Sequence, residues 1–227
     1  MNSFRLTLHP RSAFGTPLAG DTLFGQLCWA LRHLLGNTRL NTLLDGYTNG
    51  QPFAVISDAL PKGFLPLPSL PSSFWAKNEV DRKILKKKRW LPLENIESPL
   101  EDWQSLAYSD NEAVEAVTGV FAALNTEQAQ PHNSINRQTG TTGEGQFAPY
   151  SQAQIWFHPA MHLDLYIALD ESRLSLAELE SALAYIGQTG FGRDASIGLG
   201  KFNLVGSAQA KPFSSNTDNK PNAWLTL

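Results

Sequence analysis

The same strand–helix–strand pattern occurs twice along the sequence, and this repetition constrains the chain to an α+β fold. Residues 4–8 alternate apolar and polar side chains, as a half-buried strand does, and residues 53–56 are expected to form a second strand. Between them, Leu and Phe side chains recur at helical spacing from 23 to 35, with Asp21 as the predicted N-cap. A short helix over 40–44 completes this first segment.

The second copy begins at residues 154–157 and 163–169, which alternate as strands do. Ser175 and Glu178 form a capping-box pattern that predicts the start of a helix, and residues 201–205 are the last expected strand. The chain is therefore predicted to contain tandem ferredoxin-like (RRM-like) β-α-β units with antiparallel sheets. The N-terminal unit would span residues 1–146, and the C-terminal unit residues 147–227.

Residues 61–146 are predicted to be an insertion within the first unit. Prolines and the lack of a steady period indicate irregular structure up to residue 104, residues 112–124 favour a helix, and the polar stretch 125–146 favours a loop. Between Lys77 and Arg89, seven Lys or Arg side chains oppose only two acidic ones, although the whole chain has a formal net charge of −3. Any contact with a polyanion is therefore expected to be local.

The composition is that of a folded soluble protein, with 42% hydrophobic and 17% charged residues. No apolar run reaches the roughly 18 residues of a membrane-spanning helix, and the first residues lack the apolar region of a signal peptide. The single cysteine, Cys28, excludes an internal disulfide and falls on the apolar face of the first helix. We therefore expect a cytoplasmic protein without a metal site or cofactor.

A glycine-rich segment, residues 187–200, lies between the last expected helix and the last expected strand. Glycine allows a positive φ and a close backbone approach, so N–H groups near Gly190, Gly192 and Gly198 could point at phosphate oxygens. Arg193 would add a charge-assisted donor, and Phe191 could either stack on a nucleotide or fill the core. The order helix–loop–strand does not fit a dinucleotide fingerprint or a P-loop. The alternative is a purely structural loop.

A glycine-rich loop before the last strand resembles the hallmark of the RAMP superfamily of CRISPR RNA-binding proteins. Three further segments resemble the fourth subunit of the type III-A (Csm) interference complex. They are residues 14–29 at the entry to the first helix, the Lys-Lys-Lys-Arg-Trp run at 86–90, and the His-Asn-Ser-Ile-Asn-Arg-Gln-Thr-Gly loop at 132–140. All four segments occur in the order that the family shows.

The resemblance implies a non-catalytic subunit of a type III CRISPR effector complex with a role in antiviral defense. Such a subunit binds the 5′ handle of the guide RNA (crRNA), caps the complex beside the large polymerase–cyclase subunit, and contacts a backbone RAMP subunit. Target RNA would be reached only indirectly. The expected RNA-binding residues are Lys86, Lys87, Lys88, Arg89, Trp90, His132, Asn136, Arg137, Thr139, Gly190, Phe191, Gly192, Arg193, Ser196 and Gly198.

The residues themselves leave alternatives open. The cations of 86–89 suit phosphates and Trp90 suits base stacking, but a solvated charge run beside a core Trp has the same pattern. The polar side chains of 132–139 suit single-stranded RNA edges and 2′-hydroxyls, or they could satisfy one another in an Asx or Ser turn.

Single residues of the chain are compatible with two enzymatic functions. His33 lies on the exposed side of the first helix, where some RAMP relatives carry the histidine of a metal-independent endoribonuclease that processes precursor guide RNA. General acid–base catalysis needs a second group within reach, and the sequence assigns none. Asp21 could resemble the metal-binding aspartate of backbone subunits, although an N-cap is the simpler role. Pro159 argues against a helical metal pair at His158 and His162. No catalytic residue is therefore predicted.

Overall fold

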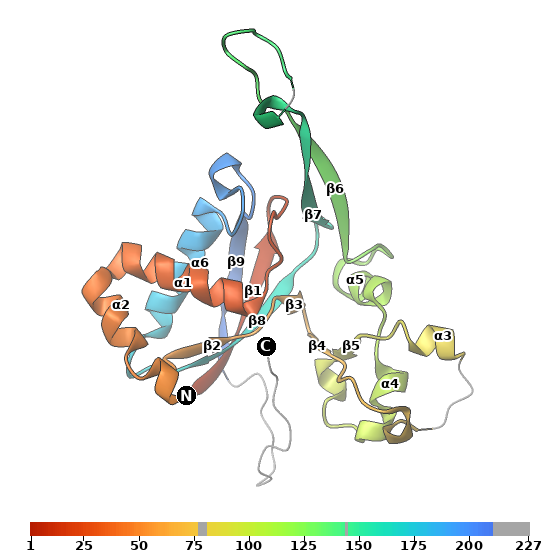
Figure 1. Cartoon of the computed structure of the whole chain (residues 1–227). Helices are drawn as coiled ribbons and strands as arrows, with labels where there is room; N and C mark the ends of the chain where they lie inside the picture. Colours follow the sequence, from red (N-terminus) through yellow and green to blue (C-terminus); the bar gives the residue numbers. More distant parts are fainter. Residues whose placement is uncertain (77–80, 144, 211–227) are drawn as a thin grey trace.

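The main sheet of the computed structural model contains strands from both predicted units. The structure describes residues 1–76, 81–143 and 145–210. The sheet order is β2 (Ala54–Ile56), β8 (Leu163–Leu169), β1 (Asn2–Pro10) and β9 (Phe202–Ala210), with all neighbours antiparallel. Strand β3 (Leu60–Pro61) also pairs with β8. Helices α1 (Gly20–Leu35) and α6 (Leu176–Thr189) cover one face, and α2 (Asn37–Leu44) follows α1 (Figure 1).

The α+β class is confirmed, but the division into tandem units at residues 146 and 147 is not. Strand β1 of the first predicted unit pairs with both β8 and β9 of the second. The two strand–helix–strand segments therefore share one sheet and one hydrophobic core, which the chain completes only after the long insertion. Residues 211–227, at the end of the second predicted unit, lie outside the described residues.

Alternation along β1 places Phe4, Leu6 and Leu8 in the core beneath the helices. Arg5, Thr7 and His9 therefore point to the opposite face of the sheet. All but one of the side chains of β8 are buried as well.

Asp164 of β8 carries a carboxylate that is fully buried on the face away from the helices. Its oxygens accept hydrogen bonds from the Thr7 hydroxyl at 2.7 Å and from the Gly63 N–H at 2.9 Å, and Arg5 lies 3.8 Å away. Since Gly63 forms the turn after β3, this buried carboxylate fastens the start of the insertion to the sheet.

The first part of the insertion forms a small lobe beside the sheet (Figure 1). Strands β4 (Phe64–Pro66) and β5 (Trp90–Pro92) pair in it, with short helices α3 (Arg82–Leu85) and α4 (Trp103–Leu106) and the longer α5 (Asp110–Thr118). The helix predicted over 112–124 is shorter than expected, because Gly119 ends α5 with a φ of +76°.

The second part of the insertion is a two-stranded ribbon, so the prediction of a loop over 125–146 is wrong for residues 125–132. Strand β6 (Asn125–His132) pairs with β7 (Tyr150–Phe157) over eight residues. The ribbon projects away from the sheet (Figure 1). Nearly every β6 side chain is exposed, so β6 lacks the apolar–polar alternation by which sequence reasoning detects strands.

The two main helices begin in different ways. Helix α6 has the predicted capping box, in which Ser175 and Glu178 bond each other's backbone N–H groups. Asp21 is not the N-cap of α1, because that position is Ala19 and Asp21 lies in the first turn. Asp58 instead accepts the hydrogen bond of the Gly20 N–H at 2.7 Å. No described helix is long and apolar enough to cross a membrane.

Candidate RNA interface

The glycine loop, residues 190–200, is folded tightly against itself. Gly190 and Gly200 have φ values of +103° and +72°, and a Cβ on Gly200 would lie 2.1 Å from the Phe191 carbonyl oxygen. Phe191 is fully buried in the main core. Of the two alternatives considered for Phe191, the structure shows the one in which it fills the core, so its place among the expected RNA-binding residues is not supported.

Three segments are joined at the glycine loop. Gly200 donates its N–H to the Ala13 carbonyl at 2.7 Å, and Arg193 donates its N–H to the Thr16 hydroxyl at 2.9 Å. The Arg193 guanidinium reaches the Ala153 carbonyl of β7 at 2.6 Å. The loop after β1 (residues 11–19, the β1–α1 loop), the glycine loop and the ribbon strand β7 are thus held together at one end of the sheet.

Most N–H groups of the glycine loop already have partners. Those of Gly190, Phe191, Arg193, Ile197 and Gly198 donate to oxygens of the protein, as do the two that follow Gly198. The prediction that successive N–H groups face phosphates is therefore limited to the few that remain. The exposed side chains of the loop are those of Arg193, which is 45% exposed, of Ser196 and of the apolar Ile197.

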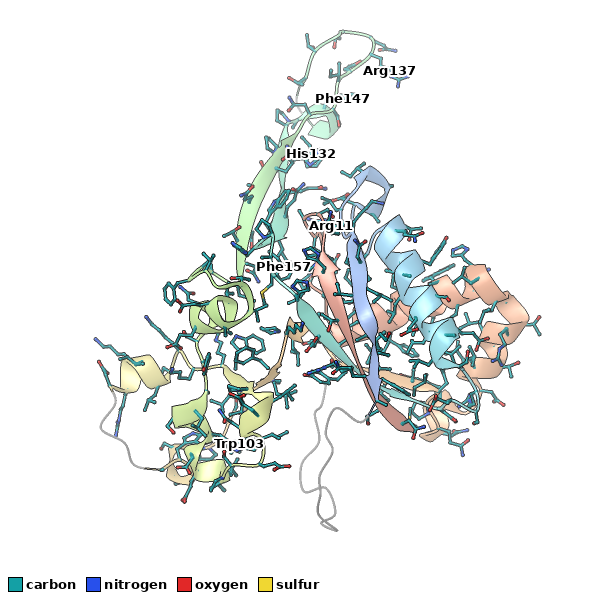
Figure 2. All side chains as sticks on the ribbon, turned by 180° about the vertical axis from the view of Figure 1, so that it is seen from behind. Arg11, Trp103, His132, Arg137, Phe147 and Phe157 are labelled. Atoms are coloured by element: carbon teal, nitrogen blue, oxygen red, sulfur yellow. The ribbon has the colours of Figure 1, made fainter. Side chains whose placement is uncertain are left out.

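Sequence reasoning missed two cations at this end of the sheet, Arg11 and Lys201. The Arg11 N–H donates to the Lys201 carbonyl at 2.8 Å, and the exposed Arg11 side chain makes no hydrogen bond or ion pair with any described residue. Figure 2 shows Arg11 near the point where the ribbon leaves the sheet. Only the antiparallel pairing of the first and last strands brings both residues to this end of the sheet, and the sequence carries no local signal of that pairing.

The loop residues 132–139 lie at the tip of the ribbon, where Figure 2 labels His132 and Arg137. The Asn136 side chain accepts a hydrogen bond from the Gln138 N–H at 2.9 Å, which forms the Asx turn of the alternative interpretation. The Thr139 hydroxyl bonds that of Thr141 at 3.0 Å. Arg137 stays exposed. The structure does not bring these residues to the glycine loop.

The His132 ring closes the end of the ribbon by stacking on Tyr150, with centroids 5.3 Å apart and planes at 15°. This contact supports the paired strands where the tip loop begins. RNA binding by the tip residues stays a prediction.

The basic segment 86–90 lies in the lobe, away from the glycine loop (Figure 1). Lys88 pairs with Glu112 at 3.0 Å, and Arg89 lies 3.8 Å from Asp110. The Trp90 indole N–H donates to Asp110 at 2.7 Å.

Half of this segment's charge is therefore matched within the lobe. The backbone N–H of Ser109 is the main cause that lowers the pKa of Glu112 to about 2, with help from the Ser109 hydroxyl and Lys88. Lys86 and Lys87 remain exposed without an ion pair to a described residue. Lys77 and Glu79, which contribute to the basic stretch in the sequence, lie outside the described residues.

His33 has aromatic neighbours. Its ring lies 6.1 Å from the Trp29 ring and 6.2 Å from the Tyr185 ring, between centroids, and it makes no hydrogen bond with a described residue. Among the described residues, no group of three His, Cys, Asp or Glu side chains could hold a metal ion.

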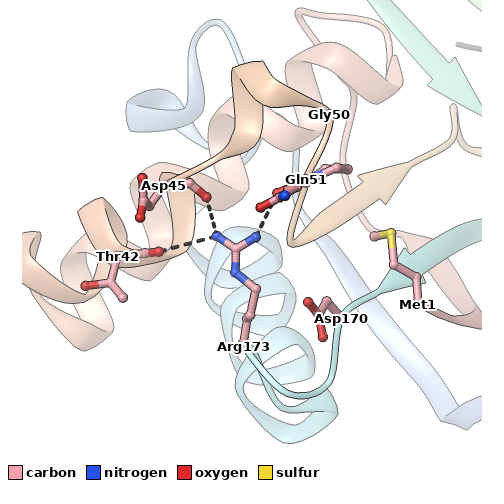
Figure 3. A pocket seen from close by; sticks show the side chains of 8 residues that line it. Met1, Thr42, Asp45, Gly50, Gln51, Asp170 and Arg173 are labelled. Carbon is pink, nitrogen blue, oxygen red and sulfur yellow. Dashed lines mark hydrogen bonds between the residues drawn. The ribbon is translucent and has the colours of Figure 1, made fainter.

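A pocket of about 500 Å³ lies between the first strand and α2 (Figure 3). The Arg173 guanidinium lines it and donates to the carbonyls of Gln51 and Asp45, both at 2.7 Å, and of Thr42 at 3.3 Å. Because these backbone oxygens occupy its donors, Arg173 fixes the turn after α2. The pocket contains none of the predicted RNA-binding residues.

The fold is shared with chains of type III CRISPR complexes. One match is to the crystal structure of a Csm3–Csm4 subcomplex of the type III-A interference complex, with a TM-score of 0.58 and 16% identity over 91% of this chain and 68% of the other. A second is to a Csm1–Csm4 cassette in complex with pppApA, with a TM-score of 0.56 and 18% identity over 91% and 70%.

A type III-B Cmr-β complex bound to cognate target RNA matches with a TM-score of 0.50 and 10% identity, over 92% of this chain and 60% of the other. No protein-family model and no curated protein matches the sequence. The resemblance to a RAMP-like CRISPR protein of the Csm4 kind is confirmed at the level of the fold.

Proposed function

We propose that this chain is a non-catalytic, RNA-binding subunit of a type III CRISPR ribonucleoprotein. It would hold the 5′ handle of the guide RNA and cap the complex beside the large polymerase–cyclase subunit, with a backbone RAMP subunit as its other neighbour. Support comes from the shared fold, since the matching chains belong to Csm1–Csm4 and Csm3–Csm4 assemblies. The motif order in the sequence supports the same role.

The strand order also supports a ferredoxin-like description, but with one unit instead of two. The sequence β1-α1-β2 followed by β8-α6-β9 forms an interleaved antiparallel sheet in the order β2-β8-β1-β9. This is the β-α-β-β-α-β pattern of that fold. The lobe and the ribbon would then be one insertion between its second and third strands.

The main support for an RNA site is the contact between the glycine loop and the β1–α1 loop. This arrangement holds Arg11 and Arg193 at one end of the sheet, where the Arg11 guanidinium is available to phosphates and Arg193 offers only the donors that Ala153 and Asp194 do not occupy. Asp194 pairs with Arg193 at 3.1 Å and offsets part of that charge. A site with so few free cations binds RNA weakly by itself, so we expect the large subunit to contribute part of the surface.

The test is a titration of labelled guide RNA with the chain, with and without the large polymerase–cyclase subunit. A guide with the natural 5′ handle is compared with one whose handle is scrambled. Arg11→Ala is expected to weaken binding by several-fold, because one phosphate contact is lost. Arg32→Ala, on the outer side of α1, is the charge-matched control. Equal affinity for both guides in the presence of the partner would refute handle recognition.

The absence of catalysis is part of the proposal and has its own test. Purified chain is incubated with repeat-containing precursor RNA in EDTA, and the expected result is uncut RNA with both the wild type and His33→Ala. A discrete product from the wild type that disappears in His33→Ala would establish the endoribonuclease alternative instead.

A further inference from the structure

Two histidines stack on the face of the sheet opposite the helices. His9 is near the end of β1, and His162 lies directly before β8, one position beyond the last registered pair of these strands. Their ring centroids are 4.8 Å apart, with the planes at 22°. Both side chains are partly exposed. The pair lies at the end of the sheet that also carries Arg11.

Hydrogen bonds define which nitrogen of each ring is available. His9 Nε2 is 2.8 Å from the Pro159 carbonyl oxygen, and His162 Nδ1 is 3.1 Å from the Ala160 carbonyl oxygen. A carbonyl only accepts, so these nitrogens carry the protons. His9 Nδ1 and His162 Nε2 are the remaining nitrogens, and each becomes a second donor when its ring is protonated.

The charged groups around the pair are mostly cationic. Arg11 directly follows β1, Lys201 directly precedes β9, and Lys62 donates its backbone N–H to the His162 carbonyl at 3.1 Å. Arg5 lies further along the same face.

Two further titratable groups belong to the adjoining elements. Asp164 is fully buried, with its oxygens bonded to Thr7 and Gly63. His158 accepts a hydrogen bond from the Ala160 N–H at Nδ1, at 3.2 Å, so that nitrogen is unprotonated. No exposed carboxylate on these elements offsets a positive charge on the stacked rings.

We infer that the His9–His162 pair is a proton-dependent site for a phosphate group of RNA. Two stacked imidazolium rings repel each other, and an anion that accepts a hydrogen bond from each free nitrogen removes that repulsion. Histidine changes charge between about pH 5 and 8, so the contact strengthens as the pH falls through this range. This inference rests on the proposed function, because it extends the RNA surface of Arg11 and Arg193 onto the opposite face of the sheet.

The first experiment follows the histidine ring signals of the isolated chain by NMR as the pH is changed. Inorganic phosphate, compared with chloride at equal ionic strength, is expected to move the titration of His9 and His162 to higher pH and to leave that of His33 in place. An unchanged titration of both rings would overturn the site.

The second experiment measures the affinity of handle-containing RNA at pH 6 and pH 8. We expect about tenfold tighter binding at pH 6, and loss of this gain in His9→Gln and His162→Gln but not in the matched control His33→Gln. A gain that persists in both variants would overturn the inference.

The outcomes separate this inference from the proposed function. Handle-specific binding at pH 8 without a gain at pH 6 leaves the proposed function standing and refutes the histidine site for RNA. A phosphate-dependent NMR shift without any RNA binding, even when the large subunit is present, refutes the RNA source and the proposed function together, and identifies a site for free phosphate.

Discussion

Replacing Gly192 by alanine tests whether the glycine loop is held by its close approach to the β1–α1 loop. Gly192 has a φ of +72°, and an added Cβ would lie 2.6 Å from both Cβ and Oγ1 of Thr16. A left-handed backbone costs a residue with a side chain about 1–2 kcal/mol, and forcing a methyl group into packed atoms costs about 1–3 kcal/mol. We therefore expect Gly192→Ala to lower the free energy of unfolding by about 2–5 kcal/mol.

Gly198→Ala is the matched control. Gly198 also has a positive φ, +101°, but no atom lies within 4 Å of an added Cβ. Only the backbone cost of about 1–2 kcal/mol is expected there. Urea denaturation at 25 °C measures both values. An equal decrease in the free energy of unfolding of the two variants would refute the argument that contact with Thr16 holds the loop.

The same pair of variants tests the link between this loop and RNA. The Arg193 N–H bonds the Thr16 hydroxyl, so a side chain at Gly192 displaces Arg193, whereas one at Gly198 leaves it in place. Guide affinity is measured at a temperature at which both variants are folded. Wild-type affinity in folded Gly192→Ala would show that the loop is a structural turn and would remove Arg193 from the proposed site.

Four other results follow from the described contacts. Asp164→Ala should lower the free energy of unfolding, measured by urea denaturation, by about 3–5 kcal/mol, because it leaves Arg5 without its buried partner. A decrease below about 1 kcal/mol would contradict the role of this carboxylate. Glu112 has a lowered pKa, so its contribution to stability is present above about pH 4.5 and is lost as the pH falls toward 2. The difference in melting temperature between the wild type and Glu112→Gln should therefore shrink over that range. A difference that stays constant with pH would refute the stabilising role of the Glu112 carboxylate. Lys86→Ala should reduce the salt slope of guide binding by about 1 if the basic segment contacts a phosphate, and an unchanged slope would exclude that contact. Burial raises the pKa of Cys28 to about 11, so iodoacetamide at pH 8 should modify the native protein far more slowly than the urea-unfolded one.

Local signals in the sequence predicted local structure well. The capping box of Ser175 and Glu178 fixes the start of α6, because both partners lie within one turn of the helix. The predicted strand at 163–169 is the observed β8. In both cases the physical cause of the element lies within the segment itself.

Non-local partners explain most of what the sequence did not reveal. Nothing within β1 specifies that it pairs with both β8 and β9, so the shared sheet was read as two units. Phe191 follows a glycine and precedes another, but its burial depends on a core built from distant helices and strands. The ion pairs of Lys88 and Arg89 likewise depend on α5, which the sequence places about twenty residues away.

The open face of the sheet limits where single-stranded RNA can bind. RRM domains stack bases on aromatic side chains at the centre of the sheet surface. Here the central strand β8 places Asp164 and Tyr166 on that face, and their exposed fractions are 0% and 5%. A buried carboxylate repels phosphate, and a buried ring offers no surface for stacking. The groups accessible at the end of the sheet are instead the exposed Arg11 and Arg193 and the partly exposed, stacked His9 and His162. RNA binding by this chain should therefore follow the end of the sheet and avoid its centre.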